Sequence, residues 1–173
     1  MPSEKMAGLI AAAIVSDTVM FKSPTSTEKD RRMAARMARI GNVSLEDLGK
    51  KIFAASSSER PVEELLFSDF KEFHIAGHFF GVGQITCVDS PRLLSRKDEF
   101  LSLMEKTAQE RGYGMMLLML TDVLLEGTQL IYLGDHDTMR QAFNTEVRDN
   151  EVFLPKVMSR KKQIIPMLTA LWG

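Results

Sequence analysis

The chain has 173 residues, of which 45% are hydrophobic and 26% are charged, and its formal net charge is -1. This is the length of one ordinary domain with its own core, and the composition excludes a disordered or fibrous chain. A net charge near zero provides no global field for nucleic acid or an acidic membrane, so anion binding must come from a local cluster.

Cys87 is the single cysteine of the sequence, which excludes an internal disulfide and a thiolate metal cage. A lone cysteine fits a reducing compartment. The longest apolar stretches fall short of the roughly 18 to 20 residues that a membrane-spanning helix needs. The N-terminus also lacks a secretory pattern, so we expect a cytoplasmic protein with no membrane partner.

Two helices are expected in the first 41 residues. Ser3 is a suitable N-cap for a helix through Ile14, which is apolar on nearly every side and is therefore predicted to be buried. Thr25 and Glu28 form a capping-box pattern for a second helix, and Gly41 provides its C-terminal stop.

The remaining elements alternate between helices and strands. In chain order they are a helix from Ser44 toward Ala55, a short helix from Pro61 to Leu66, a hairpin of strands 70–75 and 79–88, a long helix from Ser90 to about Arg111, strands 115–120 and 130–133, a short helix over 138–143 and an edge strand over 151–154. The run 115–120 is apolar at every position, which is typical of a strand covered on both faces. We therefore expect an α/β fold: a single domain over residues 1–173, with a mixed β-sheet flanked by helices on both faces.

The most informative polar pattern is SRKKQ, residues 159–163, at the predicted start of the C-terminal helix, with Ser159 as its cap. Three cations in a first helical turn oppose the helix dipole by about 0.3 to 1 kcal/mol each. Backbone N–H groups at a helix start bind phosphate, arginine adds a planar fork and lysine adds a mobile charge. The pattern suits a phosphate or diphosphate, and a solvated basic patch is the alternative.

Asp17 ends the apolar first helix, where an unpaired carboxylate is costly to bury. A hard divalent cation such as Mn²⁺ or Mg²⁺ and a set of local capping hydrogen bonds are the two explanations. His74 and His78 lack a nearby carboxylate, so we expect structural or solvated side chains rather than metal ligands. Asp135 precedes a short helix and is predicted to be its cap.

Five segments resemble, in the same order, the C-terminal region of family II inorganic pyrophosphatases of the DHH phosphoesterase superfamily. They are AGLIAAAIVSDTVMFKSPTSTEKD, DFKEF, VGQI, TDVLLEG and SRKKQ. The resemblance covers essentially the whole chain, and SDT-x3-KSPT with SRKKQ is its most specific pair. It implies a manganese-dependent hydrolase of pyrophosphate in which this chain is the substrate-clamping C-terminal domain, while an N-terminal DHH domain holds most of the metal ligands.

The resemblance also implies residue roles. Arg160 and Lys161 match the family's phosphate-binding pair, Lys71 of DFKEF matches a further substrate-binding lysine, and Lys22 of FKSPT is a supporting contact. Asp17 matches an aspartate that reaches a metal in the complete enzyme, which favours the metal explanation over capping. The implied metal is Mn²⁺, with Mg²⁺ or Co²⁺ as alternatives; metal-activated hydroxide attacks a phosphoryl group while cations neutralise its charge.

The sequence departs from the family in lacking HxDxD, a second aspartate strand and the DHH triplet. We therefore expect a shortened chain that is inactive and binds no metal alone, whose partners are pyrophosphate and an N-terminal DHH domain, with a homodimer of the complete enzyme. CBS regulatory modules in the parent protein stay open. The alternatives are a free-standing phosphate or polyphosphate-binding module, the same domain of an exopolyphosphatase, and a purely structural interaction domain.

Overall fold

The computed structural model describes residues 1–54 and 59–173. The predicted α/β class with a mixed sheet is confirmed. Contacts within the chain further divide it into two compact units, Met1–Ser56 and Ser57–Gly173, each of which is described by itself. Within the described ranges, no helix has the length and apolar character required to cross a bilayer.

The first unit consists of α1 (Glu4–Asp17), α2 (Glu28–Ile40) and α3 (Leu45–Ala54). Ser3 caps α1 as predicted, since its side chain accepts a hydrogen bond from Met6 N at 3.3 Å. The prediction that α1 is buried is wrong for one of its faces, where Met6 is 52% and Leu9 62% exposed. The unit's small core, which includes Ala7, Ala11, Met37 and Ala38, lies on the other side of α1.

The cap of α2 lies two residues later than predicted. Thr27, rather than Thr25, accepts from Asp30 N at 3.3 Å, and the Asp30 carboxylate accepts from Thr27 N at 2.8 Å. The hydroxyl of Thr25 is instead paired with that of Ser23 at 2.8 Å. Repeated threonines allow either register, and the one chosen completes the reciprocal pair. The predicted end of the third helix at Ala55 lies outside the described residues.

The second unit is built around a five-stranded sheet in the order β1-β2-β3-β4-β5. Its elements are α4 (Val62–Phe67), β1 (Phe70–Ile75), β2 (His78–Cys87), α5 (Ser90–Leu94), α6 (Lys97–Arg111), β3 (Met115–Asp122), β4 (Gly127–Leu133), α7 (His136–Phe143), β5 (Glu151–Pro155), η1 (Arg160–Ile164) and α8 (Ile165–Trp172). The pair β2–β3 is parallel and the other three pairs are antiparallel, which confirms the hairpin and the mixed sheet.

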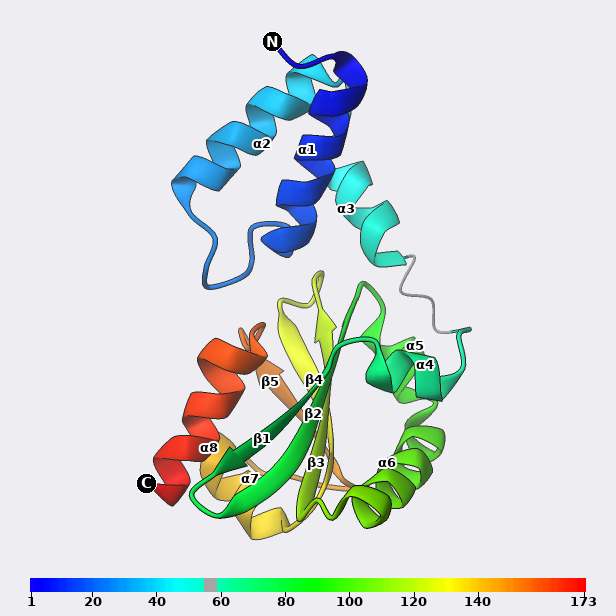
Figure 1. Ribbon diagram of the computed structural model, residues 1–173, viewed down its shortest axis with the longest axis vertical. Helices are drawn as coiled ribbons and strands as arrows, with labels where there is room; N and C mark the ends of the chain where they lie inside the picture. Colours follow the sequence, from blue (N-terminus) through cyan, green and yellow to red (C-terminus); the bar gives the residue numbers. More distant parts are fainter. Residues whose placement is uncertain (55–58) are drawn as a thin grey trace. The chain divides into compact units, whose positions relative to one another are not determined.

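Strand β3 separates two hydrophobic cores, because all eight of its residues are buried. Leu118 belongs to a cluster with Phe100 of α6, whereas Leu117 and Met119 belong to a cluster with Leu168 of α8. Helices α6 and α8 accordingly lie on opposite faces of the sheet (Figure 1). Successive residues of a strand point to opposite faces, so an unbroken apolar run fills both cores.

The predicted long helix from Ser90 to about Arg111 is divided into α5 and α6. The hydroxyl of Ser95 donates to Arg92 O at 2.7 Å and ends α5. The next residue, Arg96, donates from its guanidinium to Arg60 O at 2.7 Å. The break therefore depends on a contact with a segment more than thirty residues earlier, which helical periodicity does not report.

Two glycines of the sheet region provide a test of this packing. A Cβ at Gly83 of β2 would lie 2.9 Å from Leu66 O, whereas at Gly114 the nearest atom, Phe79 O, is 3.9 Å away. Gly83→Ala is expected to lower the free energy of unfolding by about 1–3 kcal/mol through overpacking. Gly114→Ala is expected to stay within about 0.5 kcal/mol of wild type. Urea denaturation followed by circular dichroism measures both, and equal losses would contradict the close approach of α4 to β2.

Candidate phosphate-binding site

The basic segment lies where β5 leads into the C-terminal helix. Ser159 is the N-cap, as predicted, and its side chain accepts from Lys162 N at 3.2 Å. The first turn, η1, has the wider π-helical form before the chain continues as α8. Turns of this form are rare and occur frequently at functional sites.

Gln163 holds the chain that enters this turn. Its side-chain oxygen accepts from Met158 N at 2.8 Å and from Ser159 N at 3.0 Å. Its side-chain nitrogen donates to Lys156 O at 2.9 Å. One amide therefore binds three backbone groups and fixes the path from β5 into η1.

A chain of partly buried polar side chains on the sheet binds the same segment. Gln84 of β2 donates to Met158 O at 3.2 Å and to the hydroxyl of Thr121 on β3 at 3.0 Å. The hydroxyl of Thr128 on β4 donates to Val157 O at 2.6 Å and lies 3.1 Å from that of Thr121. These side chains satisfy backbone carbonyls that would otherwise be buried without partners.

Arg160 ties the turn to the start of β1. Its Nη1 donates to Asp69 O at 2.7 Å and to Val82 O at 3.0 Å, and its Nη2 donates to Asp69 Oδ1 at 2.7 Å. The arginine is buried. A residue predicted as a substrate contact is thus also a structural link between segments about ninety residues apart.

Three of the predicted substrate residues belong to the second unit, on β1 and on η1. Lys71 is exposed on β1 and pairs in register with Val82, whose carbonyl binds Arg160. Lys161 is exposed on η1, next to Arg160 in the chain. The pairing of Lys71 with Val82 lies in the middle of β2, whereas the contact between Gln84 and Thr121 that underlies the basic turn lies nearer the ends of β2 and β3.

Asp17 and Lys22 belong to the first unit, and their predicted roles stay predictions. Asp17 is exposed at the C-terminal end of α1, and Lys22 is half-buried in the turn that follows. Between them, Val19, Met20 and Phe21 all have positive φ values of 51°, 52° and 64°. Consecutive non-glycine residues in this region are strained, and such strain gathers at functional sites.

The hydroxyl of Thr18 stabilises this turn, because it accepts from Phe21 N at 3.1 Å and donates to Ile14 O at 2.7 Å. No group of three or more histidine, cysteine, aspartate or glutamate side chains suited to a metal occurs among the described residues. The carboxylate of Asp17 is a suitable donor for Mn²⁺, but a metal centre needs further ligands beside it. Burial raises the pKa of Cys87 to about 12, so its thiolate is not available as a ligand.

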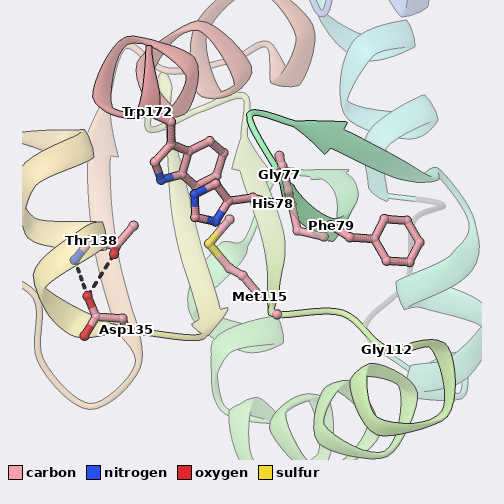
Figure 2. A pocket seen from close by; sticks show the side chains of 10 residues that line it. Gly77, His78, Phe79, Gly112, Met115, Asp135, Thr138 and Trp172 are labelled. Atoms are coloured by element: carbon pink, nitrogen blue, oxygen red, sulfur yellow. Dashed lines mark hydrogen bonds between the residues drawn. The ribbon is translucent and has the colours of Figure 1, made fainter.

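A separate pocket of about 380 Å³ lies at the opposite end of the β1–β2 hairpin (Figure 2). The ring of His78 stacks on Trp172 with centroids 4.1 Å apart. Asp135 accepts from Thr138 N at 2.8 Å, which confirms its predicted role as the cap of α7. No predicted substrate residue lines this pocket in the part of the chain that is described.

Sequence reasoning missed Asp69, Gln84 and Gln163. All three stand inside motifs that were recognised, since Asp69 opens DFKEF, Gln84 lies in VGQI and Gln163 closes SRKKQ. Their roles depend on contacts between distant segments. The motifs therefore include these residues but do not indicate which groups they bind.

The sequence profile of the DHHA2 domain matches residues 50–171. This chain belongs to the DHHA2 domain family. The match covers most of the second unit, which contains the sheet and the basic turn, and leaves Asp17 and Lys22 outside it.

Relatives of this DHHA2 chain extend the similarity to the first unit. A manganese-dependent inorganic pyrophosphatase of Methanocaldococcus jannaschii is 39% identical over 94% of the chain and 54% of its own length. A cobalt-dependent inorganic pyrophosphatase of Clostridium perfringens is 39% identical over 98% of the chain and 32% of its own length. The DHHA2 chain thus spans about half, or less, of the length of these relatives.

Solved structures give the same result. A crystal structure of a candidate family II inorganic pyrophosphatase from Methanococcus jannaschii superposes with a TM-score of 0.85 at 36% identity. The superposition covers 99% of this chain and 57% of that one. The resemblance stated from the sequence motifs is confirmed.

Substitutions in the basic turn test the structural role of Arg160. Arg160→Ala removes the donor to two backbone carbonyls and one carboxylate, and is expected to lower the free energy of unfolding by about 1–3 kcal/mol. Lys162→Ala, at an exposed position of the same turn, is expected to change it by less than about 0.5 kcal/mol. Thermal and urea unfolding measure both, and a neutral Arg160→Ala would mean that the link to β1 adds no stability.

Proposed function

We propose that the chain is the substrate-clamping part of a manganese-dependent inorganic pyrophosphatase, in which Lys161, Lys71 and Arg160 bind pyrophosphate. The observation that carries the proposal is that Arg160, on a turn fixed by Gln163 and Gln84, binds the carbonyl of Val82, and Val82 pairs in register with Lys71. The relatives are named as inorganic pyrophosphatases, which supports the choice of pyrophosphate over longer polyphosphates.

The two lysines suit this role because both are exposed and come from different elements. A diphosphate has two charged groups, and cations from separate sides neutralise charge on the transferring and the leaving phosphate. Ordered hydrogen bonds hold the backbone beneath Lys161, so its ammonium group is presented without a large ordering cost. Lys22 would add a supporting contact from the first unit.

The metal belongs to the complete protein in this proposal. Asp17 would contribute one carboxylate, and the other ligands would come from the part of the relatives' length that this chain does not span. Bound Mn²⁺ supplies Lewis-acid chemistry and a nucleophilic hydroxide. This chain's own part is to bind and orient the diphosphate and to neutralise its charge.

An N-terminal DHH domain is the proposed partner, and the apolar face of α1 is a suitable place for it to pack. Met6 and Leu9 are more than half exposed, and Ile10 is 37% exposed beside them. An adjoining groove of about 530 Å³ is lined by Gly8, Leu9 and Val43, among others. Exposed apolar clusters of this kind mark protein contacts. A homodimer of the complete enzyme stays a prediction.

Titration calorimetry of pyrophosphate tests the clamp directly. Lys161→Ala and Lys71→Ala are each expected to weaken binding about tenfold or more, since a hydrogen bond to a charged group is lost. Lys106→Ala removes the same charge from an exposed position of α6 and is the matched control, expected to bind as wild type. Binding that is insensitive to both site lysines would contradict the proposed clamp.

Hydrolysis by the chain alone is expected to be absent. Asp17 is one donor, and a hydrolytic metal centre of this kind needs several. Phosphate release from pyrophosphate with Mn²⁺ should equal that of Mn²⁺ in buffer. Metal-dependent release that is lost in Asp17→Asn would show instead that a complete centre forms in this chain.

A further inference from the structure

The two ends of the Arg160 guanidinium have different partners. Nη1 binds the backbone carbonyls of Asp69 and Val82, which are fixed in the β1–β2 ladder. Nη2 binds the side-chain carboxylate of Asp69 at 2.7 Å. The arginine side chain is only 6% exposed, whereas that of Asp69 is 53% exposed. One end is therefore anchored inside the protein, and the other is covered by a side chain that reaches solvent.

We infer that the Asp69 carboxylate occupies the position on Arg160 that a phosphate oxygen of the substrate takes, and that pyrophosphate displaces this internal anion when it binds. Asp69 is then a positioning residue that controls access to Arg160. The inference rests on the proposed function, because it names the step by which one of the three proposed cations becomes available.

The chemistry of the exchange is balanced. Carboxylate and phosphate oxygens accept the same charge-assisted hydrogen bond from a guanidinium, so one can replace the other at Nη2. Release of Asp69 would leave a guanidinium that is only 6% exposed without its anion, so the incoming phosphate oxygen must replace the carboxylate as it leaves. The carbonyl of Asp69 also accepts from Gln84 N at 2.9 Å, so the backbone beneath Arg160 keeps its place during the exchange.

The contact also explains how a buried guanidinium is tolerated without substrate. An uncompensated buried charge is strongly destabilising, and the carboxylate neutralises it. An incoming anion must interact with Arg160 more strongly than the tethered carboxylate does. A multiply charged diphosphate meets this condition better than a singly charged anion, so Asp69 discriminates against weak anions by competition.

Asp69→Asn separates the charge of this residue from its shape. The amide oxygen still accepts from Nη2, but the competing charge is removed. Calorimetric titration is expected to show about two- to fivefold tighter pyrophosphate binding, because the competing negative charge is removed while the hydrogen bond to Nη2 is kept. Acetate, a monoanion, is expected to weaken pyrophosphate binding more in Asp69→Asn than in wild type, because the tethered competitor is gone.

Two further variants show whether the change in affinity arises at Arg160. Glu105→Gln removes one negative charge from an exposed position of α6 and is expected to leave the dissociation constant unchanged. Arg160→Gln removes the positive charge for which the two anions compete, so adding Asp69→Asn to it is expected to give no tighter binding. Thermal unfolding checks that each variant is folded before titration.

The outcomes distinguish the inference from the function on which it rests. Tighter binding by Asp69→Asn that disappears in the Arg160→Gln background supports the displaced anion. Unchanged or weaker binding by Asp69→Asn overturns it, while loss of binding in Lys161→Ala still supports the clamp. Tighter binding by Asp69→Asn, together with unchanged binding by Lys161→Ala and Lys71→Ala, supports the exchange at Arg160 and overturns the clamp. No pyrophosphate binding by wild type or Asp69→Asn overturns both.

Discussion

The contact on which the site depends is the attachment of the segment after β5 to the sheet. Gln84 donates to the carbonyl of Met158, Gln163 accepts from the amides of Met158 and Ser159, and Arg160 reaches the start of β1. Each of these bonds joins a side chain to backbone, and two of them attach the segment to β1 and β2. A loop with such partners holds its side chains in defined positions.

Hydrophobic packing explains why those polar side chains meet. Strand β3 fills cores on both faces of the sheet, and α6 and α8 cover them. The position of α8 against one face sets where its first turn begins, and that turn carries the basic residues. The polar chain of Gln84, Thr121 and Thr128 then fills the space beneath the entering segment. The cores place the site, and the polar chain fixes its orientation.

The first unit contrasts with the second in how few large apolar side chains it buries. Its core contains small residues such as Ala7 and Ala11, while larger apolar side chains of α1 are exposed. A strained turn with three positive φ values follows Asp17. The chain spans 54% of the length of the Methanocaldococcus jannaschii relative.

The sequence by itself determined the α/β class, the hairpin, the fully buried central strand and the caps at Ser3, Asp135 and Ser159, because these follow from local periodicity and from hydrogen bonds a few residues apart. Ordered motifs also determined the family. Only the tertiary structure decided the register of the α2 cap, the break between α5 and α6, the exposed face of α1 and the pairing of Arg160 with Asp69. Each of these depends on a competition between local alternatives or on contacts between distant segments, and neither is encoded in residue spacing.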